Sequence, residues 1–489
     1  MAGENVPTRE ALRRDLCRIL PEDQVLTADE DLTGYRNDAS WFKGQPDAVV
    51  LPTSTEEVKK CLAYAYSHDI PIIPRGSGTG LSGGVVPLRG GIVFDLGRMN
   101  KIIEIDTKNL TATVQPGVIT GELHRAVEKL GLFYPPDPAT LTVCTIGGNV
   151  ATRAGGPRGV KYGTTKDYVL GLEAVVPPGE VIRAGGRTVK FSAGYEIGRL
   201  FVGSEGTLGI ITEIILKLIP LPPAKKTMLV SFATIEAAAE TVVEIISRAI
   251  VPTTLEIMDK KTLQAVQAFR DVGYPTDVEG LLIIEVDGSE RQVAEDMEVV
   301  ERVCREMGAI EIKVAKDQKE ADALWTGRRS MMAAFAHMRP TLLSEDVTVP
   351  RSKVPAMVKA IREISAKYNI ELGLGGHVGD GNMHPNFLLD KRNREEFARA
   401  EKVMAEVAQA AVDMGGVVSG EHGIGIAKAE YLRWQCGDLM LHYMREIKKV
   451  FDPKGLMNPG KIWWEQSALG TPGQGSTEEG GSHGTGPVN

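Results

Sequence analysis

Glycine most restricts how this chain can fold, because it is concentrated in a few short segments. The segment from Gly375 to His384 holds four glycines in ten residues. His377 and His384 are seven residues apart, a spacing that would place them on one face of a helix. Since each glycine disfavours a helix by about 1 kcal/mol relative to alanine, a strand–turn–strand is predicted instead. In that arrangement the two imidazoles can converge.

A second short segment, Ser419–Gly423, adds Glu421 and His422 to this set. With the two histidines, Glu421 forms a two-histidine, one-carboxylate set that suits Zn²⁺, Fe²⁺ or Mn²⁺ and leaves coordination positions open. His422 stays free to act as a base, since its unperturbed pKa of about 6.5 suits proton abstraction near neutrality. The alternative is that these histidines only form hydrogen bonds in a core or a turn. The functional interpretation is favoured because all of these side chains share glycine-rich surroundings.

The segment from Arg75 to Gly84 has five glycines in ten residues and follows a predicted strand. Glycine accepts positive φ, so consecutive N–H groups can converge into a nest that binds phosphate, here a pyrophosphate. The spacing matches neither the dinucleotide fingerprint nor a Walker loop, and a flexible turn is the alternative. Further glycine- and proline-rich segments favour a long ligand that lies across several loops: Pro135–Pro138, Thr145–Asn149, Ala154–Gly156, Tyr162–Gly163 and Gly203–Gly209.

The length of 489 residues, with 43% hydrophobic side chains, predicts at least two domains. The first is predicted to be α+β and to end at the cluster Pro220, Pro222 and Pro223, which cannot continue a strand or a helix. Beyond it, strands and helices alternate, which predicts an antiparallel sheet with helices on one face. Near the N-terminus, Thr8 is a possible cap of a short helix, and Thr53–Glu56 has the pattern of a capping box.

The composition argues against several classes of protein. A net charge of −8 and a pI near 5.7 disfavour nucleic-acid binding. The sequence contains no run of about 18 uncharged apolar residues, the length needed to cross a bilayer, and its first residues lack a secretory pattern. A cytoplasmic protein without a transmembrane segment is therefore expected. The five cysteines are widely separated, which predicts free thiols and no iron–sulfur centre in this chain. The Gly- and Ser-rich residues 463–489 are predicted to be a disordered tail.

The order of these motifs resembles the FAD-linked oxidase superfamily, which includes vanillyl-alcohol oxidase and p-cresol methylhydroxylase, over about residues 45–462. The resemblance implies an α+β fold with a two-subdomain FAD-binding domain of the p-cresol methylhydroxylase type at 45–223. A cap domain at 224–415 would carry an antiparallel sheet covered by helices. Residues 416–462 would return to the FAD-binding domain, and residues 1–44 would form an N-terminal helical segment.

The resemblance also implies which residues hold FAD. Members that attach FAD covalently have a histidine where this chain has Thr79, so a non-covalent cofactor is expected. The phosphate loop would hold the pyrophosphate, and the later loops would line the ribityl chain, the flavin ring and the adenosine. The implied cofactor-binding residues are Pro74, Arg75, Gly76, Ser77, Gly78, Thr79, Gly80, Leu81, Ser82, Pro136, Asp137, Thr145, Gly148, Ala151, Glu205, Gly206, Ile211 and Asn458.

Within the superfamily, the two histidine motifs and the Glu421-His422 pair resemble the branch of D-lactate dehydrogenases, glycolate oxidase D subunits and D-2-hydroxyglutarate dehydrogenases. This implies a metal on His377, His384 and Glu421 that binds the substrate's hydroxyl and carboxylate. His422 would remove the hydroxyl proton while hydride passes from C2 to flavin N5. The remaining substrate-binding residues implied by the branch are Arg328, which would grip the C1 carboxylate, and Asn382.

The substrate expected from this resemblance is a short 2-hydroxy acid, D-lactate or glycolate. Relatives that oxidise hydroxyglutarate carry a threonine and a lysine where this chain has Met332 and Ser344, beside Glu345 and Asp346. Apolar and acidic groups there would disfavour a second carboxylate. A partner such as an electron-transferring flavoprotein or an iron–sulfur protein would accept the electrons. The alternatives are a D-2-hydroxyglutarate dehydrogenase, a non-catalytic flavin relay subunit, or a relative of alkyl-dihydroxyacetone-phosphate synthase.

Overall fold

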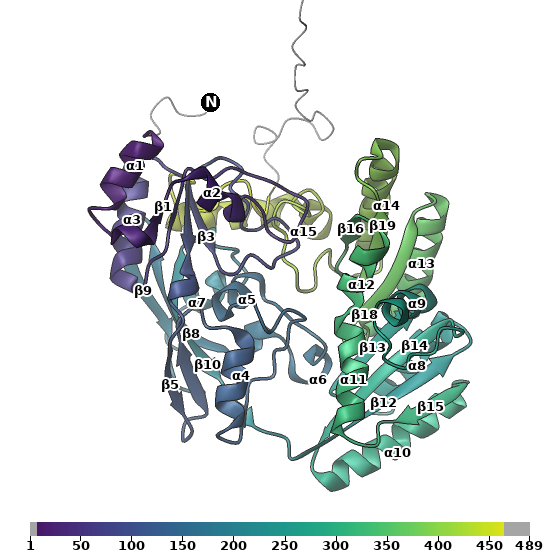
Figure 1. Cartoon of the computed structure of the whole chain (residues 1–489). Coiled ribbons are helices and arrows are strands. Elements are labelled where there is room, and N and C mark those ends of the chain that lie inside the picture. Colours follow the sequence, from purple (N-terminus) through teal and green to yellow (C-terminus); the bar gives the residue numbers. More distant parts are fainter. Residues whose placement is uncertain (1–6, 464–489) are drawn as a thin grey trace, which may run out of the picture.

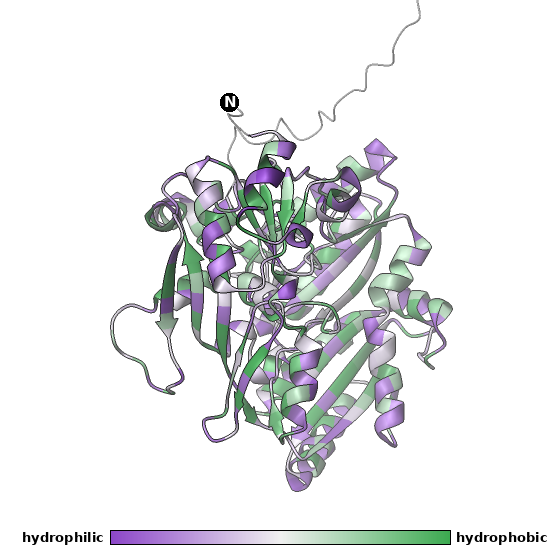
Figure 2. Cartoon of the chain, turned by 60° about the vertical axis from the view of Figure 1, so that its left-hand side comes forward, coloured by the Kyte–Doolittle hydropathy of each residue, from purple (hydrophilic) through white to green (hydrophobic). Residues whose placement is uncertain are grey.

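The computed structural model describes residues 7–463, which form two domains side by side (Figure 1). The N-terminal part, in purple and blue, and the C-terminal segment, in yellow, build one domain; the green middle part builds the other. Figure 2 shows that apolar residues are concentrated on the strands inside each domain. None of the helices in residues 7–463 is long and apolar enough to cross a membrane. The predicted disordered tail lies outside the described residues, apart from residue 463.

The first subdomain is a four-stranded sheet in the order β1-β2-β4-β3, with β2, β3 and β4 parallel. Thr8 accepts a hydrogen bond from the N–H of Ala11 and caps the first helix, as predicted. The capping box is displaced by one residue: Ser54 is the cap, and Glu57 rather than Glu56 reaches back to the N–H of Thr53. The bounds are β1 (Val25–Leu26), β2 (Ala48–Val50), β3 (Ile72–Arg75), β4 (Ile92–Asp95), α1 (Arg9–Leu16) and α3 (Thr55–Ser67).

The second subdomain is a five-stranded antiparallel sheet in the order β5-β6-β10-β8-β9. Pro220 ends the short strand β11 (Ile219–Pro220), and the first strand of the next domain begins at Ala224, so the proline cluster stands between the two. The bounds are β5 (Ile102–Asp106), β6 (Thr111–Val114), β7 (Leu132–Phe133), β8 (Val169–Val176), β9 (Glu180–Gly185), β10 (Ile210–Lys217), α4 (Thr120–Glu128), α5 (Ile146–Thr152), α6 (Gly159–Tyr162) and α7 (Ile197–Phe201).

The other domain is built on an antiparallel sheet in the order β15-β12-β14-β13-β18-β19-β16, with β17 paired to β19. Strands and helices alternate along most of this domain, as expected. Their bounds are β12 (Ala224–Phe232), β13 (Thr254–Asp259), β14 (Gly280–Gly288), β15 (Glu311–Val314), β16 (Thr341–Ser344), β17 (Val347–Thr348), β18 (Glu371–His377) and β19 (Asn382–Leu389).

Helices cover both faces of this sheet, so the prediction of helices on one face is wrong. Successive strand residues point to opposite faces: Leu282 and Ile284 pack in one core, whereas Leu281 and Ile283 pack in another. A strand that is apolar on both faces needs helices on both. One face carries α8 (Ile235–Ser247), α10 (Glu290–Glu306), α13 (Val354–Lys367) and α14 (Arg394–Asp413); the other carries α9 (Lys260–Phe269), α11 (Gln318–Arg329) and α12 (Met331–Met338).

The last helix, α15 (Leu432–Phe451), brings the chain back to the first domain, and its helical geometry is interrupted at Gly437. Lys448 donates to the carbonyl of Thr207. The N–H of Asn458 donates to the carbonyl of Ile72 on β3 at 2.7 Å. The C-terminal segment therefore lies beside the strand that precedes the phosphate loop.

Candidate active site

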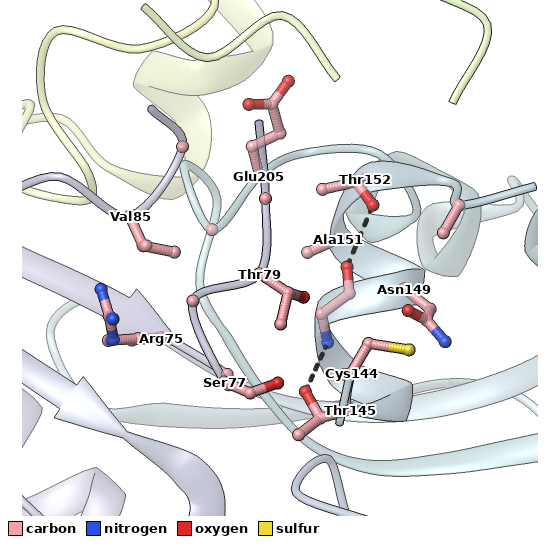
Figure 3. Close-up of a pocket in the computed structure, with 18 of the residues that line it drawn as sticks. Arg75, Ser77, Thr79, Val85, Cys144, Thr145, Asn149, Ala151, Thr152 and Glu205 are labelled. Atoms are coloured by element: carbon pink, nitrogen blue, oxygen red, sulfur yellow. Dashed lines mark hydrogen bonds between the residues drawn. The ribbon is translucent and has the colours of Figure 1, made fainter. Parts of the chain in front are cut away.

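A pocket of about 210 Å³ opens where the loop after β3 faces α5 (Figure 3). Fifteen of the expected cofactor residues line it: Pro74, Arg75, Gly76, Ser77, Gly78, Thr79, Gly80, Leu81, Ser82, Thr145, Gly148, Ala151, Glu205, Gly206 and Ile211. Glu421 and His422 line the same pocket. Residues far apart in the sequence thus share one cavity.

Close packing explains the glycines of the phosphate loop. A Cβ on Gly76 would lie 2.4 Å from Thr145 Oγ1, and Gly78 has φ +69° above the Arg75 guanidinium. That guanidinium donates to the carbonyls of Asn37 and Gly34, so it braces the loop from behind rather than facing a phosphate. Backbone N–H groups and the hydroxyls of Ser77 and Thr79 remain as donors of the loop, and a cradle of this shape fits a pyrophosphate-containing cofactor such as FAD.

Three expected cofactor residues do not line the pocket. Asn458 donates from Nδ2 to the carbonyls of Gly84 and Glu205, at 2.8 and 2.6 Å. The carbonyl of Pro136 is bonded to His124 Nε2, and Asp137 faces Arg158 at 3.3 Å. Burial raises the pKa of Asp137 to about 6, although Arg158 opposes the shift. These residues contact neighbouring segments of the FAD-binding domain instead.

Fifteen further lining residues were not among the implied cofactor-binding residues. Several stand in or beside the glycine- and proline-rich segments of the sequence, so their position was foreseeable. Asp38, Leu96 and Pro116 come from segments that carry no such signal and are brought in by the fold. The full set is Asp38, Gly84, Val85, Leu96, Pro116, Pro138, Ala139, Thr140, Cys144, Gly147, Asn149, Thr152, Ala154, Ser204 and Gly209.

The segment 375–384 is the hairpin of β18 and β19. His377 ends β18 opposite Asn382, and His384 on β19 stands opposite Gly375. Because opposed residues and residues two apart share a face, both imidazoles lie on the same side of the sheet. Their ring centroids are 5.0 Å apart. The two histidines therefore converge through strand geometry, as the glycine content of the segment indicates.

Glu421 completes the donor set from another segment. Its Oε1 lies 3.3 Å from His377 Nε2 and 3.3 Å from His384 Nε2, and the three donor atoms lie within 4.8 Å of one another. His384 Nε2 is buried and makes no hydrogen bond. Burial opposes ionisation of both partners, but the opposite charges prevail: the pKa of His377 is raised well above its usual value and that of Glu421 is lowered. Two imidazole nitrogens and a carboxylate around one point fit a divalent metal.

A buried carboxylate that the sequence analysis missed supports this set. Glu256 on β13 stands opposite His377 in the sheet register, and its Oε1 is 2.6 Å from His377 Nδ1. Its other oxygen accepts a hydrogen bond from Arg328 Nε at 2.7 Å. A glutamate that is alone in the apolar run Leu255–Met258 was the available signal. Arg328, expected to hold substrate, thus has at least one of its N–H groups committed to Glu256.

Asp346 anchors the segment that carries Glu421. Its Oδ2 accepts the N–H groups of Glu421 and His422 at 3.0 and 2.8 Å, and its Oδ1 accepts from Asn382 Nδ2 at 2.7 Å. Burial alone would raise the pKa of Asp346, but the neighbouring His422 and Lys428 hold it below its usual range.

The acidic pair beside Ser344 therefore does not face a substrate. Asp346 is buried among its hydrogen-bond donors, and Glu345 is buried against Lys428 at 3.0 Å. The expectation that acidic groups repel a second carboxylate is thus wrong for these two residues, because each has its own internal partner. Asn382, expected to bind substrate, also directs its amide N–H groups toward Asp346 and the β17 backbone.

His422 is placed between the metal-type donors and the pocket. Its ring stacks on that of His384 with centroids 5.1 Å apart. Ser82 in the phosphate loop donates to its backbone carbonyl at 3.0 Å. Burial lowers the pKa of His422 to about 4, so the imidazole is neutral at pH 7 and able to accept a proton.

Comparison with known proteins identifies both parts of the chain. A model described as an FAD binding domain matches residues 46–185, and a model of the C-terminal domain of FAD linked oxidases matches residues 221–462. The glycolate oxidase subunit GlcD of Bacillus subtilis (strain 168) is 48% identical over 430 residues, which cover 88% of this chain and 92% of that protein. The D-lactate dehydrogenase of Anaerostipes hadrus is 37% identical over 453 residues, which cover 90% of this chain and 95% of that protein.

Among solved structures, p-cresol methylhydroxylase with bound substrate has a TM-score of 0.77 at 21% identity, covering 92% of this chain and 96% of that chain. This likeness shows the fold and confirms the p-cresol methylhydroxylase type expected from the sequence. The identities to GlcD and D-lactate dehydrogenase confirm the expected branch. The chain belongs to the FAD-linked oxidase family and is an FAD-linked oxidoreductase.

Proposed function

We propose that this protein oxidises a short 2-hydroxy acid, D-lactate or glycolate, to the 2-keto acid with a divalent metal beside FAD. The observation that carries the proposal is the convergence of His377, His384 and Glu421 beside His422 at the mouth of the cofactor pocket. A relay of electrons alone would need neither a donor set nor a base. The names of the similar proteins, glycolate oxidase subunit and D-lactate dehydrogenase, support the same substrate class.

Two groups that bind to the chain supply part of the chemistry. A metal on the three donors would act as a Lewis acid toward the substrate hydroxyl, and bound FAD would accept hydride at N5. Glu421 and the two histidines would hold the metal, and the neutral His422 would take the hydroxyl proton. Burial of this cluster keeps bulk water away from the proton that moves.

Recognition of the substrate's C1 carboxylate falls to Arg328. Arginine has five N–H donors: in Arg328, Nε is engaged with Glu256 and one terminal nitrogen donates to Met331 Sδ at 3.9 Å, which leaves donors for a carboxylate. The ion pair orients the guanidinium, because a buried charge-assisted hydrogen bond restricts the side chain. Asn382 is proposed to act on the substrate from the start of β19, next to the donor set.

FAD is held without a covalent bond, since this chain has Thr79 where members of the superfamily with covalent FAD have a histidine. All five cysteines are free, and Cys17, Cys61, Cys144, Cys304 and Cys436 come from separate segments. Electrons therefore pass to a separate protein, an electron-transferring flavoprotein or an iron–sulfur subunit. We propose that the enzyme works in the cytoplasm.

The second candidate substrate is D-2-hydroxyglutarate. Glu345 and Asp346 are paired internally, so they do not exclude a second carboxylate. Met332 remains the one difference that would offer that carboxylate an apolar neighbour.

The test is anaerobic reduction of the bound flavin. The absorbance near 450 nm would be followed while D-lactate, L-lactate, glycolate and D-2-hydroxyglutarate are added separately, before and after chelation and after metal is restored. We expect D-lactate or glycolate to bleach the flavin, chelation to abolish the bleaching, and metal to restore it. Bound flavin that no hydroxy acid reduces, even with added metal, would exclude the proposed reaction. Faster reduction by D-2-hydroxyglutarate would move the assignment to the second candidate.

A further inference from the structure

The segment that carries Glu421 and His422 is held from two sides. Asp346 binds it from the cap domain, as described above. From the FAD-binding domain, Ser82 accepts the N–H of Ile426 at 2.8 Å and donates to the carbonyl of His422. A third contact comes from Glu205, which the sequence analysis assigned to the cofactor.

Glu205 lines the cofactor pocket, but its unusual backbone directs its carboxylate at another segment of the protein. Its φ is +51°, a left-handed conformation that glutamate seldom adopts. Its N–H donates to the carbonyl of Ala151, and its own carbonyl accepts from Asn458. In Figure 3 the carboxylate points away from Thr79, toward the C-terminal part of the chain. The carboxylate is thus aimed at a protein partner.

That partner is the backbone just after His422. Oε1 accepts the N–H of Ile424 at 2.7 Å, and Oε2 accepts the N–H of Gly425 at 2.8 Å. Between them and the site stands Gly423, with φ +84° and a Cβ position only 3.1 Å from the Glu205 carboxyl carbon. Burial raises the pKa of Glu205 to about 7, and the two N–H groups oppose this shift. A buried carboxyl group that accepts both N–H groups fixes the position and the orientation of a short segment.

We propose that Glu205 is a positioning residue that fixes Glu421 and His422 against the cofactor pocket, so that metal affinity and flavin reduction both depend on it. The inference rests on the proposed function. Ile424 follows Glu421 by three residues and His422 by two, so a shift of the Ile424 and Gly425 backbone moves the preceding ligand and base directly. The loop that carries Glu205 in the FAD-binding domain and the segment that carries Glu421 and His422 are thereby mechanically joined.

The rival role for Glu205 is confined to FAD. Glu205 lines the pocket, and its backbone carbonyl accepts a hydrogen bond from Asn458 Nδ2. On this alternative, Glu205 serves only to shape the cavity. In that case its substitution would weaken FAD binding and leave metal affinity unchanged. The two roles therefore differ in a measurement that does not involve activity.

The experiment compares wild type with Glu205→Gln. Glutamine has nearly the same size, but an NH₂ donor replaces one of the two acceptor oxygens. That NH₂ group would face the N–H of Ile424 or Gly425, so one hydrogen bond is lost. The matched control is Glu213→Gln, which changes a half-buried glutamate on β10 of the same domain. Three quantities are measured: FAD content from the visible spectrum, metal affinity by competition with a chromophoric chelator, and the rate of anaerobic flavin reduction.

We expect E205Q to retain FAD, to bind metal about 10- to 100-fold more weakly, and to reduce its flavin more slowly even at saturating metal. The control should match wild type in all three. Unchanged metal affinity in E205Q would overturn the inference, whether FAD is lost or kept. If E205Q does not fold, Glu205→Asp keeps the carboxyl group but shortens the reach, and the same comparison applies. A wild-type protein that binds no metal would instead refute the proposed function.

Discussion

At the scale of single residues, the site depends on side chains whose role is defined by the residues that they contact. His377 and His384 have recognisable neighbours in the sequence, but Glu256 is 121 positions from the histidine that it contacts. One oxygen of Glu256 forms an ion pair with Arg328, and the other orients His377. A carboxylate that bonds Nδ1 fixes the ring so that Nε2 faces the metal position.

The change Glu256→Gln should therefore weaken metal binding by about 10- to 100-fold while FAD remains bound. Glutamine cannot accept from Arg328 and His377 with both atoms, so the ring loses its orientation. Metal affinity would be measured by chelator competition, and FAD by its spectrum. The control is Glu285→Gln, a buried glutamate of the neighbouring strand that bonds Thr227 and Trp325. Equal metal affinity in E256Q and wild type would contradict this role.

At the scale of elements, the cofactor pocket is shaped by helices that do not touch it. His124 on α4 is buried, and its Nε2 binds the carbonyl of Pro136, which holds the segment before the lining residue Pro138. Burial lowers the pKa of His124 to about 4, with the charge of Arg158 acting in the same direction. The native state therefore holds this histidine in its neutral form.

This shift predicts how stability depends on pH. Between about pH 4 and 6.5 the unfolded chain binds a proton on His124 that the native protein does not bind, so the free energy of unfolding falls as the pH falls through this range. The contribution is at most about 3 kcal/mol. His124→Gln keeps an N–H donor for Pro136 but does not titrate, so its thermal midpoint should fall less than that of wild type between pH 6.5 and 4.5.

The comparison is made with saturating FAD and with His68→Gln, which replaces an exposed histidine on the same domain. The control should keep the full pH dependence. An identical pH dependence in H124Q and wild type would show that His124 is protonated in the native state or accessible to water.

At the scale of the whole molecule, the site exists only while the two domains are docked. Helix α6 of the FAD-binding domain contacts the end of β14 in the cap domain, where Asp287 accepts from Lys161 and from the Tyr162 hydroxyl at 2.5 and 2.9 Å. Asp287 is buried, so these bonds are shielded from solvent. Breaking a bond to a buried charged group costs about 1–3 kcal/mol.

We expect Asp287→Asn to loosen the docking of the domains without unfolding either one. Amide hydrogen exchange should increase in residues 157–164 and 284–290 and stay unchanged in the sheet cores. Flavin reduction should slow, because Glu421 and His422 would no longer be held between both domains. The control Asp296→Asn changes a partly exposed residue of α10. Unchanged exchange at α6 and β14 would mean that other contacts suffice to dock the domains.

The sequence alone determined the local parts of this protein. The glycines of 375–384 exclude a helix and lead to a hairpin, the glycines of 75–84 lead to a phosphate cradle, and the proline cluster separates two domains. These features are readable because they depend on backbone conformations that only neighbouring residues control. The donor types His377, His384 and Glu421 are likewise visible, since few buried sites collect them without a use.

Only the tertiary structure decided what those parts do together. In the folded chain the Arg75 guanidinium binds backbone carbonyls behind its loop, Glu345 and Asp346 point inward, and Arg328 pairs with Glu256. The Glu205 carboxylate likewise points toward the segment of the base. Each of these outcomes depends on a buried charge finding a partner from a distant segment, because an unpaired charge in the interior is too costly to persist. Such pairing is a property of the packed chain, and no local pattern encodes it.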